Sequence, residues 1–229
     1  MNNGEKRKVY LESTIFGYLT GRPSAIPKTA YWQALTRQWW ENCLPKVDCF
    51  VSRWVISESE DGDADAVERR KVALKDFPEI RPAADKVAAL AQKLIETHAL
   101  PENEVADAFH IATATVGGMD YLLTWNCKHL ANYVALPKTY AVLTEAGYKC
   151  PVIITPEKYL KMNETMEMLL QKDVSDSIVD RIHETRHRIA AYFGNDFMRM
   201  ARFGAGELDL PPDFFVSSRN ESKLAPAMA

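Results

Sequence analysis

Four polar side chains stand at or near the expected ends of strands, the place where ligands bind in parallel α/β proteins. They are Glu12, Glu58, Asp107 and Asn126. Asp107 lies among small and apolar residues, and an isolated carboxylate is costly to bury unless it is paired or bound to a metal. A solvated helical face would explain the same pattern. Because the four positions are far apart in the chain, only a fold that joins strand ends at one edge could unite them.

Alternating strands and helices would position these residues. Short apolar segments predict strands at 8–12, 49–52, 120–125 and 152–154, and Gly21, Pro23 and Pro27 mark a loop after the first strand. Helical patterns are expected over 29–42, 54–65, 66–74 and 83–97, from Asn103 to a stop at Gly117-Gly118, and again from Thr155. This alternation indicates an α/β layer fold with a mostly parallel sheet.

The C-terminal part of the chain has a different pattern. No strand is expected beyond about Met162, and the apolar spacing of 173–193 predicts one amphipathic helix, followed by a shorter helical segment to Arg202. The tail after Gly204 is rich in Pro, Ser and Asn and should be weakly ordered. We therefore expect a first domain of residues 1–160 and a helical appendage, 161–229, that docks on it or mediates oligomerisation.

Composition limits the classes of function. With 47% hydrophobic and 26% charged residues, the chain has the balance of a soluble globular protein. Its net charge of -3 provides no global basic field, so a nucleic acid would have to be held by a local groove or by metal ions. The four cysteines form no C-x-x-C pair, which argues against a zinc knuckle. Without a signal peptide or a long apolar segment, we expect a cytoplasmic protein with free thiols and no membrane partner.

Four segments, in order and with the spacing of one domain, resemble the four motifs of the PIN domain. They are Tyr10–Leu19 with Glu12, Val51–Glu58, Ala106–Ala112 with Asp107, and Tyr121–His129 with Asn126. Two further segments, 39–41 and 151–156, are similar to a subgroup of the VapC-like toxins. The resemblance covers residues 1–160 and implies a three-layer α/β/α PIN-like fold with the activity of a toxin-antitoxin ribonuclease.

The resemblance also implies a metal site. Carried over by position, Glu12, Glu58 and Asp107 would be the ligands of Mg²⁺ or Mn²⁺, and Asn126 would assist. Hard divalent cations prefer oxygen ligands. Such an ion can activate water, orient the phosphodiester and stabilise charge on the leaving oxygen. The implied activity is endoribonucleolytic hydrolysis of RNA.

Three positions depart from the family's usual pattern. Motif one has Glu12 where Asp is usual, and motif four has Asn126 and His129 where carboxylates are common. Fewer negative charges should weaken metal affinity, but Glu12 and Asn126 are similar to a subgroup pattern, so we interpret them as variation. His110, one turn from Asp107, could contact phosphate or transfer a proton. A histidine beside a phenylalanine on a helix is more often a packed, hydrogen-bonded residue, so we do not include it in the expected site.

Functions of other classes remain as alternatives. His183-Glu184-Thr185-Arg186-His187 matches the H-E-x-x-H zinc-peptidase motif, and Glu207 follows where a third ligand could stand. Because Arg186 lies between the two histidines and little chain remains to form a substrate cleft, a solvated or interfacial helix is the preferred interpretation. A non-catalytic PIN module that binds RNA is the second alternative. Glu12-Ser13-Thr14 lacks the paired aspartates of a haloacid-dehalogenase phosphatase.

The segment 176–196 is similar to a small antitoxin-like protein often encoded beside such PIN proteins. The chain would then carry toxin and antitoxin-like parts together, and its C-terminal segment would restrain the nuclease in cis. A guanidinium from Arg199, Arg202 or Arg219 would suit a carboxylate pocket that is short of metal. The expected partners are therefore RNA, an antitoxin or this segment, and a second copy of the chain. A helix that only mediates oligomerisation is the alternative.

Overall fold

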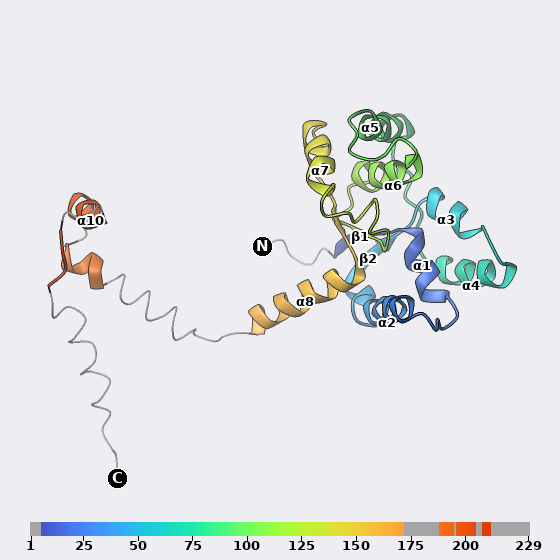
Figure 1. The fold of residues 1–229 in the computed structure, drawn as a ribbon, viewed down its shortest axis with the longest axis horizontal. Helices are drawn as coiled ribbons and strands as arrows, with labels where there is room; N and C mark the ends of the chain where they lie inside the picture. Colours follow the sequence, from blue (N-terminus) through green and yellow to red (C-terminus); the bar gives the residue numbers. More distant parts are fainter. Residues whose placement is uncertain (1–5, 172–187, 195, 205–207, 212–229) are drawn as a thin grey trace, which may run out of the picture. The chain divides into compact units, whose positions relative to one another are not determined.

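The computed structural model describes residues 6–171, 188–194, 196–204 and 208–211. The chain divides into two compact units, residues 1–168 and 169–229. The first unit has an α/β fold built on one four-stranded sheet (Figure 1). In the second, residues 188–192 are helical, Gly194 has a φ of 62°, and a further helix follows, α10 (Phe197–Gly204). The segment 172–187, with most of the expected amphipathic helix and the H-E-x-x-H motif, lies outside the described residues.

All four strands are parallel, in the order β2-β1-β3-β4. Their bounds are β1 (Arg7–Leu11), β2 (Val47–Phe50), β3 (Tyr121–Leu123) and β4 (Val152–Ile154). β1 is an inner strand, and its residues Val9, Tyr10 and Leu11 are fully buried. An apolar strand with both faces covered is typical of a parallel sheet between helices, so the predicted α/β class is confirmed.

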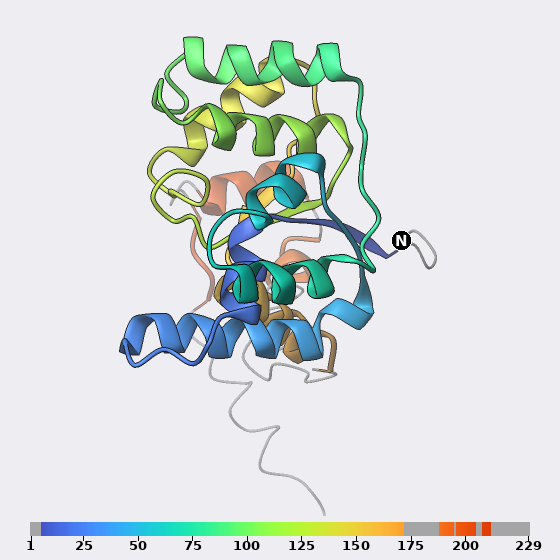
Figure 2. The ribbon, with the colours of Figure 1, turned by 90° about the vertical axis from the view of Figure 1, so that its right-hand side faces the viewer.

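Helices cover the sheet on both sides (Figures 1 and 2). On one side lie α5 (Ala84–Glu96), α6 (Val105–Val116) and α7 (Leu136–Glu145). On the other side lie α1 (Ser13–Thr20), α2 (Pro27–Asn42) and α4 (Ala64–Leu74). The remaining elements are the 3₁₀ turn η1 (Leu44–Lys46), α3 (Arg53–Ser59) after β2, and α8 (Pro156–Gln171) after β4.

Several predicted boundaries are confirmed and others are wrong. α6 ends before Gly117, and Gly118 has a φ of 69°, the conformation for which a terminal glycine is suited. The expected continuous helix over 54–65 is wrong, because α3 ends at Ser59 and Gly62 turns the chain with a φ of 103°. α4 then begins at Ala64, capped by the Asp63 carboxylate, which accepts the Ala66 N–H at 3.1 Å.

Two helices and one strand end also differ from expectation. The loop marked by Gly21 and Pro23 is confirmed between α1 and α2, but neither α1 nor α7 has a counterpart among the predicted helices. β3 is shorter than the predicted 120–125 strand, because the backbone N–H of Trp125 donates to Thr14 Oγ1 at 2.9 Å instead of to a neighbouring strand. This hydrogen bond connects the segment after β3 to the start of α1.

The outer strand β2 is extended by a segment from another part of the chain. The Val51 N–H donates to the Pro78 carbonyl at 3.1 Å, and the Ile80 N–H donates to the Val51 carbonyl at 2.8 Å. Val51 and Glu79 form an isolated parallel bridge there. None of the cysteines forms a disulfide. Among the described residues no helix has both the length and the apolar composition needed to cross a bilayer.

The central strand should dominate stability. We predict that Val9→Ala lowers the free energy of unfolding by about 2 kcal/mol, since it removes two buried methyl groups and leaves a cavity. The matched control is Val134→Ala, at a side chain that is 92% exposed, which should change it by less than about 0.5 kcal/mol. Chemical denaturation of both variants checks the prediction, and similar effects would contradict the burial of β1.

Candidate functional site

The edge of the sheet where the strands end gathers the residues expected to form the site. Glu12 follows β1 directly, and Asn126 lies just beyond β3. Glu58 belongs to α3, which begins after β2, and Asp107 belongs to the first turn of α6. Because all four strands are parallel, their carboxyl ends share one edge, the usual position of ligands in such sheets.

Glu12 is a buried carboxylate, 4% exposed, held by three hydroxyl groups. Ser13 Oγ donates to Oε1 at 2.7 Å, while Thr14 Oγ1 and Thr124 Oγ1 donate to Oε2 at 2.5 and 2.7 Å. The two threonine hydroxyls also accept backbone N–H groups, from Trp125 and Asn126 respectively, both at 2.9 Å. Each of these hydroxyls therefore has a fixed orientation, accepting from the backbone and donating to Glu12.

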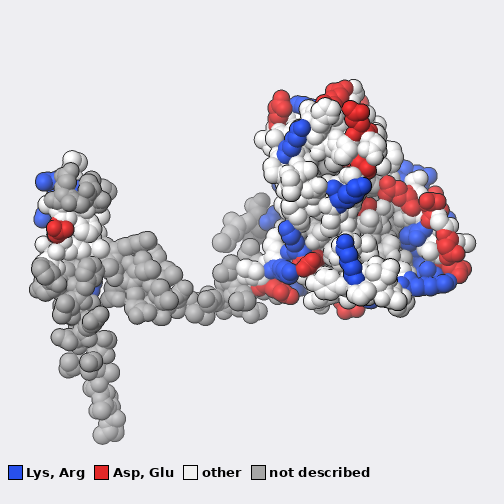
Figure 3. Space-filling model, in the orientation of Figure 1, with Lys and Arg blue, Asp and Glu red and all other residues white. Residues whose placement is uncertain are grey.

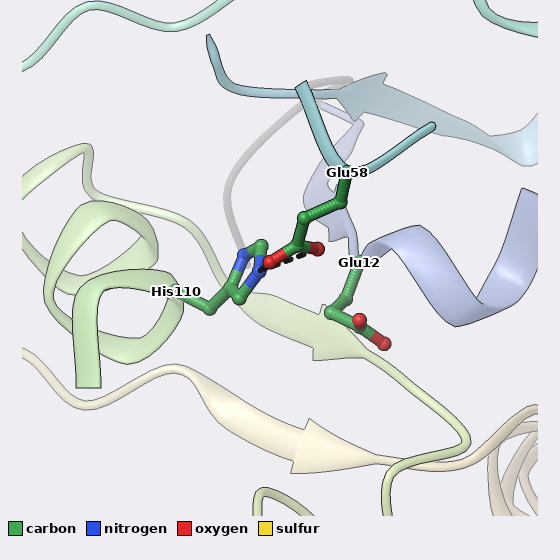
Figure 4. A group of neighbouring side chains, drawn as sticks. All are labelled: Glu12, Glu58 and His110. Carbon is green, nitrogen blue, oxygen red and sulfur yellow. Dashed lines mark hydrogen bonds and ion pairs between the residues drawn. The ribbon is translucent and has the colours of Figure 1, made fainter. Parts of the chain in front are cut away.

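Glu58 and His110 form the second part of the site. Figure 4 shows the two side chains reaching toward each other from α3 and α6, close to Glu12. His110 Nε2 lies 3.1 Å from both carboxylate oxygens of Glu58. Ligand atoms of Glu12, Glu58 and His110 all lie within 4.8 Å of one another. Three side chains from distant parts of the chain thus converge on one small volume.

A chain of hydrogen bonds fixes the ring of His110 from its other side. Nδ1 lies 2.7 Å from the Tyr10 hydroxyl, which lies 2.6 Å from Ser52 Oγ. Burial raises the pKa of Tyr10, so its hydroxyl stays protonated. When His110 is protonated, its Nδ1–H can donate to Tyr10, whose own proton then points to Ser52. The buried ring is therefore hydrogen-bonded at both nitrogens.

The carboxylates make the buried His110 easier to protonate. Burial opposes its charge, but the hydrogen bond that His110 donates to Glu58 and the charges of Glu12, Glu58 and Asp107 outweigh burial and raise the pKa of His110. Burial also opposes ionisation of Glu58, yet the hydrogen bond and charge of His110, with a hydrogen bond from Ser13, lower the pKa of Glu58. Without a metal, a proton on His110 would partly neutralise the negative charge of the site.

Asp107 lies in a neighbouring group with Asn126. Asn126 Nδ2 is 3.0 Å from both Asp107 oxygens, and its Oδ1 accepts the His129 N–H at 3.1 Å, so the amide orientation is fixed. His129 Nε2 is 3.3 Å from Glu104 Oε1. Ligand atoms of Glu104, Asp107 and His129 lie within 4.8 Å of one another and could hold an ion. His129, the third departure from the motif, is therefore part of this group.

The Asp107 carboxylate is incompletely compensated. Burial raises its pKa to about 6, against the opposing effects of the His110 charge and the Asn126 hydrogen bond. The charges of Glu104 and Glu12 also raise the pKa. A cation would favour the ionised form of this group.

The expected ligands fall into two linked groups. Glu12 and Glu58 share one with His110, and Asp107 belongs to the other. The link is Thr124, whose hydroxyl donates to Glu12 and accepts from the backbone of Asn126. The expected site did not include His110, although its position three residues after Asp107 on one helix face was a signal. Its partners Tyr10 and Ser52 are too distant in sequence to have been foreseen.

The arrangement can do two kinds of chemistry. Several carboxylates with limited exposure can hold a hard divalent cation, and the two histidines widen the range of metals that fit. The Glu58–His110 pair can also store and transfer a proton. No protein-family model matches the chain, and the comparison with curated proteins finds no match.

The charge of Asp107 should leave a signature in stability. Its pKa is about 6 in the folded chain and near 3.8 when unfolded, so the folded state holds the proton more tightly. The contribution of this proton to the free energy of unfolding is therefore fully present below pH 4 and is lost as pH rises through about 6. We predict that Asp107→Asn, which cannot ionise, makes the metal-free protein more stable than the wild type above pH 6. The difference should shrink toward pH 4.

Denaturant unfolding in a chelator, at several pH values, measures this difference. Asp61→Asn provides the control, since Asp61 is exposed and lies outside the site. The pH-dependent difference should be absent in that variant. Equal stability of Asp107→Asn and wild type at every pH would show that the Asp107 charge is already compensated.

Proposed function

We propose that this chain is a metal-dependent endoribonuclease of the PIN type, similar to the VapC-like toxins. The observation that carries the proposal is the gathering of Glu12, Glu58, Asp107 and Asn126 at one edge of a parallel sheet. Each residue comes from a different one of the four segments that resemble PIN motifs. RNA is the proposed substrate, and hydrolysis of a phosphodiester bond by water is the proposed reaction.

The donor set fits Mg²⁺ or Mn²⁺. Glu12, Glu58 and Asp107 would supply carboxylate oxygens, which hard cations prefer. Glu58 keeps 33% of its side chain exposed, so at least one ligand is accessible to solvent. Burial, together with the charges of Glu104 and Glu12, raises the pKa of Asp107, and a bound cation would favour its ionised form. When bound, the ion would supply Lewis-acid chemistry, lowering the pKa of a water and neutralising charge on the phosphate.

The chain's own residues would orient the ligands and handle protons. Ser13, Thr14 and Thr124 hold Glu12, and Asn126 holds Asp107. His110 orients Glu58 and, being able to carry a proton beside it, can accept or return one during the reaction. Such supporting groups commonly affect metal affinity or activity by about 10- to 100-fold.

Two alternatives make different demands. A PIN module that only binds RNA would keep the fold and show no metal-dependent cleavage. The zinc-peptidase alternative depends on His183, Glu184 and His187, which lie outside the described residues, so no geometry supports it.

The decisive experiment is cleavage of RNA by the purified full chain. We predict cleavage in Mn²⁺ or Mg²⁺ that a chelator abolishes. Asp107→Asn and Glu58→Gln should each reduce the rate by more than about 100-fold, because a metal ligand contributes more than the residues that orient it. Asp61→Asn and Glu60→Gln are the matched controls, because they make the same acid-to-amide change at exposed residues outside the site. Both variants should retain activity.

A readout besides activity separates metal binding from catalysis. Mn²⁺ should raise the unfolding midpoint of the wild type and do so less in Asp107→Asn, since an ion that binds the folded state stabilises it. Activity that survives chelation would contradict the proposal. Stabilisation by the metal without any cleavage would favour the RNA-binding alternative.

The C-terminal segment is proposed to restrain the nuclease in cis. Of the three arginines expected to enter the carboxylate pocket, Arg199 lies 5.5 Å from the Phe193 ring centroid, Arg202 is exposed, and Arg219 lies outside the described residues. We predict that replacing all three by alanine increases the rate of RNA cleavage by the full chain at limiting Mn²⁺. Removing residues 172–229, which leaves α8 whole, should do the same. Unchanged cleavage rates at matched metal concentration would contradict restraint in cis. The role of this segment would then be to bind an antitoxin or a second copy of the chain.

A further inference from the structure

A groove beside the candidate site is not used by the proposed chemistry. It has a volume of about 250 Å³ and lies against α3, α6 and the segment 79–82. Its lining combines apolar side chains, chiefly Trp54, Phe109 and Val87, with the cations Arg53 and Arg81. A flat apolar surface beside a positive charge suits a nucleotide, which has a flat base and a negatively charged phosphate.

Trp54 provides the flat surface. It is 38% exposed, and its ring stacks on that of Phe109 with centroids 4.7 Å apart and planes inclined by 29°. Phe109 is half-buried and holds the indole from behind. A large aromatic ring that is fixed on one side and open to solvent on the other is suited to stack a further ring.

Arg53 provides an uncompensated positive charge at the groove. The Arg81 guanidinium lies 2.8 Å from a carboxylate oxygen of Glu79, so the charges of these two groove residues offset each other. Within the described part of the chain, the exposed Arg53 guanidinium has no carboxylate partner. Figure 3 shows charges of both signs scattered over the face drawn, so a local cation matters more than any general field. A guanidinium is well suited to bind a phosphate group.

The groove lies close to the candidate site, although none of the site's carboxylates lines it. Trp54 and Glu58 are four residues apart in α3, so their side chains lie on the same face of that helix. Phe109 directly precedes His110 in α6. Ser52 lines the groove and hydrogen-bonds to Tyr10, which contacts His110. A nucleotide in the groove would therefore lie near the residues that support the candidate site.

We propose that this groove binds one unpaired base of the RNA, stacked on Trp54, with a phosphate near Arg53. The inference rests on the proposed function and adds to it a base-binding subsite beside the position of cleavage. A base within a duplex has both faces stacked on its neighbours, so only an unpaired nucleotide can use the ring of Trp54. Trp54 would be a binding residue, with no part in the chemical step.

Binding of a fluorescein-labelled oligoadenylate to the full chain tests the proposal. All proteins carry Asp107→Asn, so that the RNA stays intact, all are measured in the same buffer, and anisotropy gives Kd. Trp54→Ala should weaken binding by roughly 5- to 150-fold, the range typical of one stacked base. Trp54→Phe, which keeps an aromatic ring, should restore most of the affinity. Tyr31→Ala removes another exposed ring, 51% exposed on α2, and should leave Kd unchanged.

Trp54→Leu is a second test in case Trp54→Ala folds poorly, because leucine keeps the groove filled but has no ring. It should show the same loss of affinity that is expected for Trp54→Ala. Full affinity for the oligoadenylate in Trp54→Leu would overturn stacking on Trp54. Equal losses in Trp54→Ala and Tyr31→Ala would also overturn it. If the wild type cleaves RNA while Trp54 variants bind normally, the subsite fails and the nuclease stands. If binding depends on Trp54 and the wild type never cleaves, the subsite stands and the nuclease fails.

Discussion

Negative charge that is brought together at the end of a parallel sheet is the constraint on which the rest of this structure depends. Glu12 and Asp107 are nearly buried, and the charge of Glu12 reaches both Asp107 and His110. Hydroxyl groups surround Glu12, an amide holds Asp107, and a buried imidazole holds Glu58. Because such groups are costly to bury without partners, these surroundings are required for the fold to tolerate the site.

The sequence predicted those parts of the fold that local pattern determines. The apolar segments at β1, β2 and β4, the glycines after α6 and the alternation of strands with helices were sufficient to predict an α/β sheet. α1 was not predicted, because Gly17 and the β-branched residues Thr14 and Ile15 give a weak helical signal in a segment of eight residues. The turn between Ser59 and Ala64 was hidden by an acidic segment that is also compatible with a helix. In both places contacts with other elements decide the structure.

The candidate site, like the fold, could be predicted from the sequence only in part. The carboxylates could be named from motif resemblance and from their positions near strand ends. The grouping could not, because it depends on contacts such as Tyr10 with His110 across 100 residues and Thr124 with Glu12 across 112. His110 illustrates the limit, since a buried histidine packed beside a phenylalanine is usually structural. Here its ring is packed and hydrogen-bonded, as expected, and it also faces the carboxylates.

The backbone bridge between Val51 and the segment 78–80 has a consequence for recognition. This segment extends the outer strand of the sheet through two backbone hydrogen bonds, and Glu79 and Ile80 also form one wall of the groove beside Trp54. A wall that is bonded to the sheet is already ordered in the free protein. Little conformational entropy would then be lost when a ligand enters, so the groove is preorganised. Substitutions that loosen the bridge would therefore reduce affinity without touching any group that contacts the ligand.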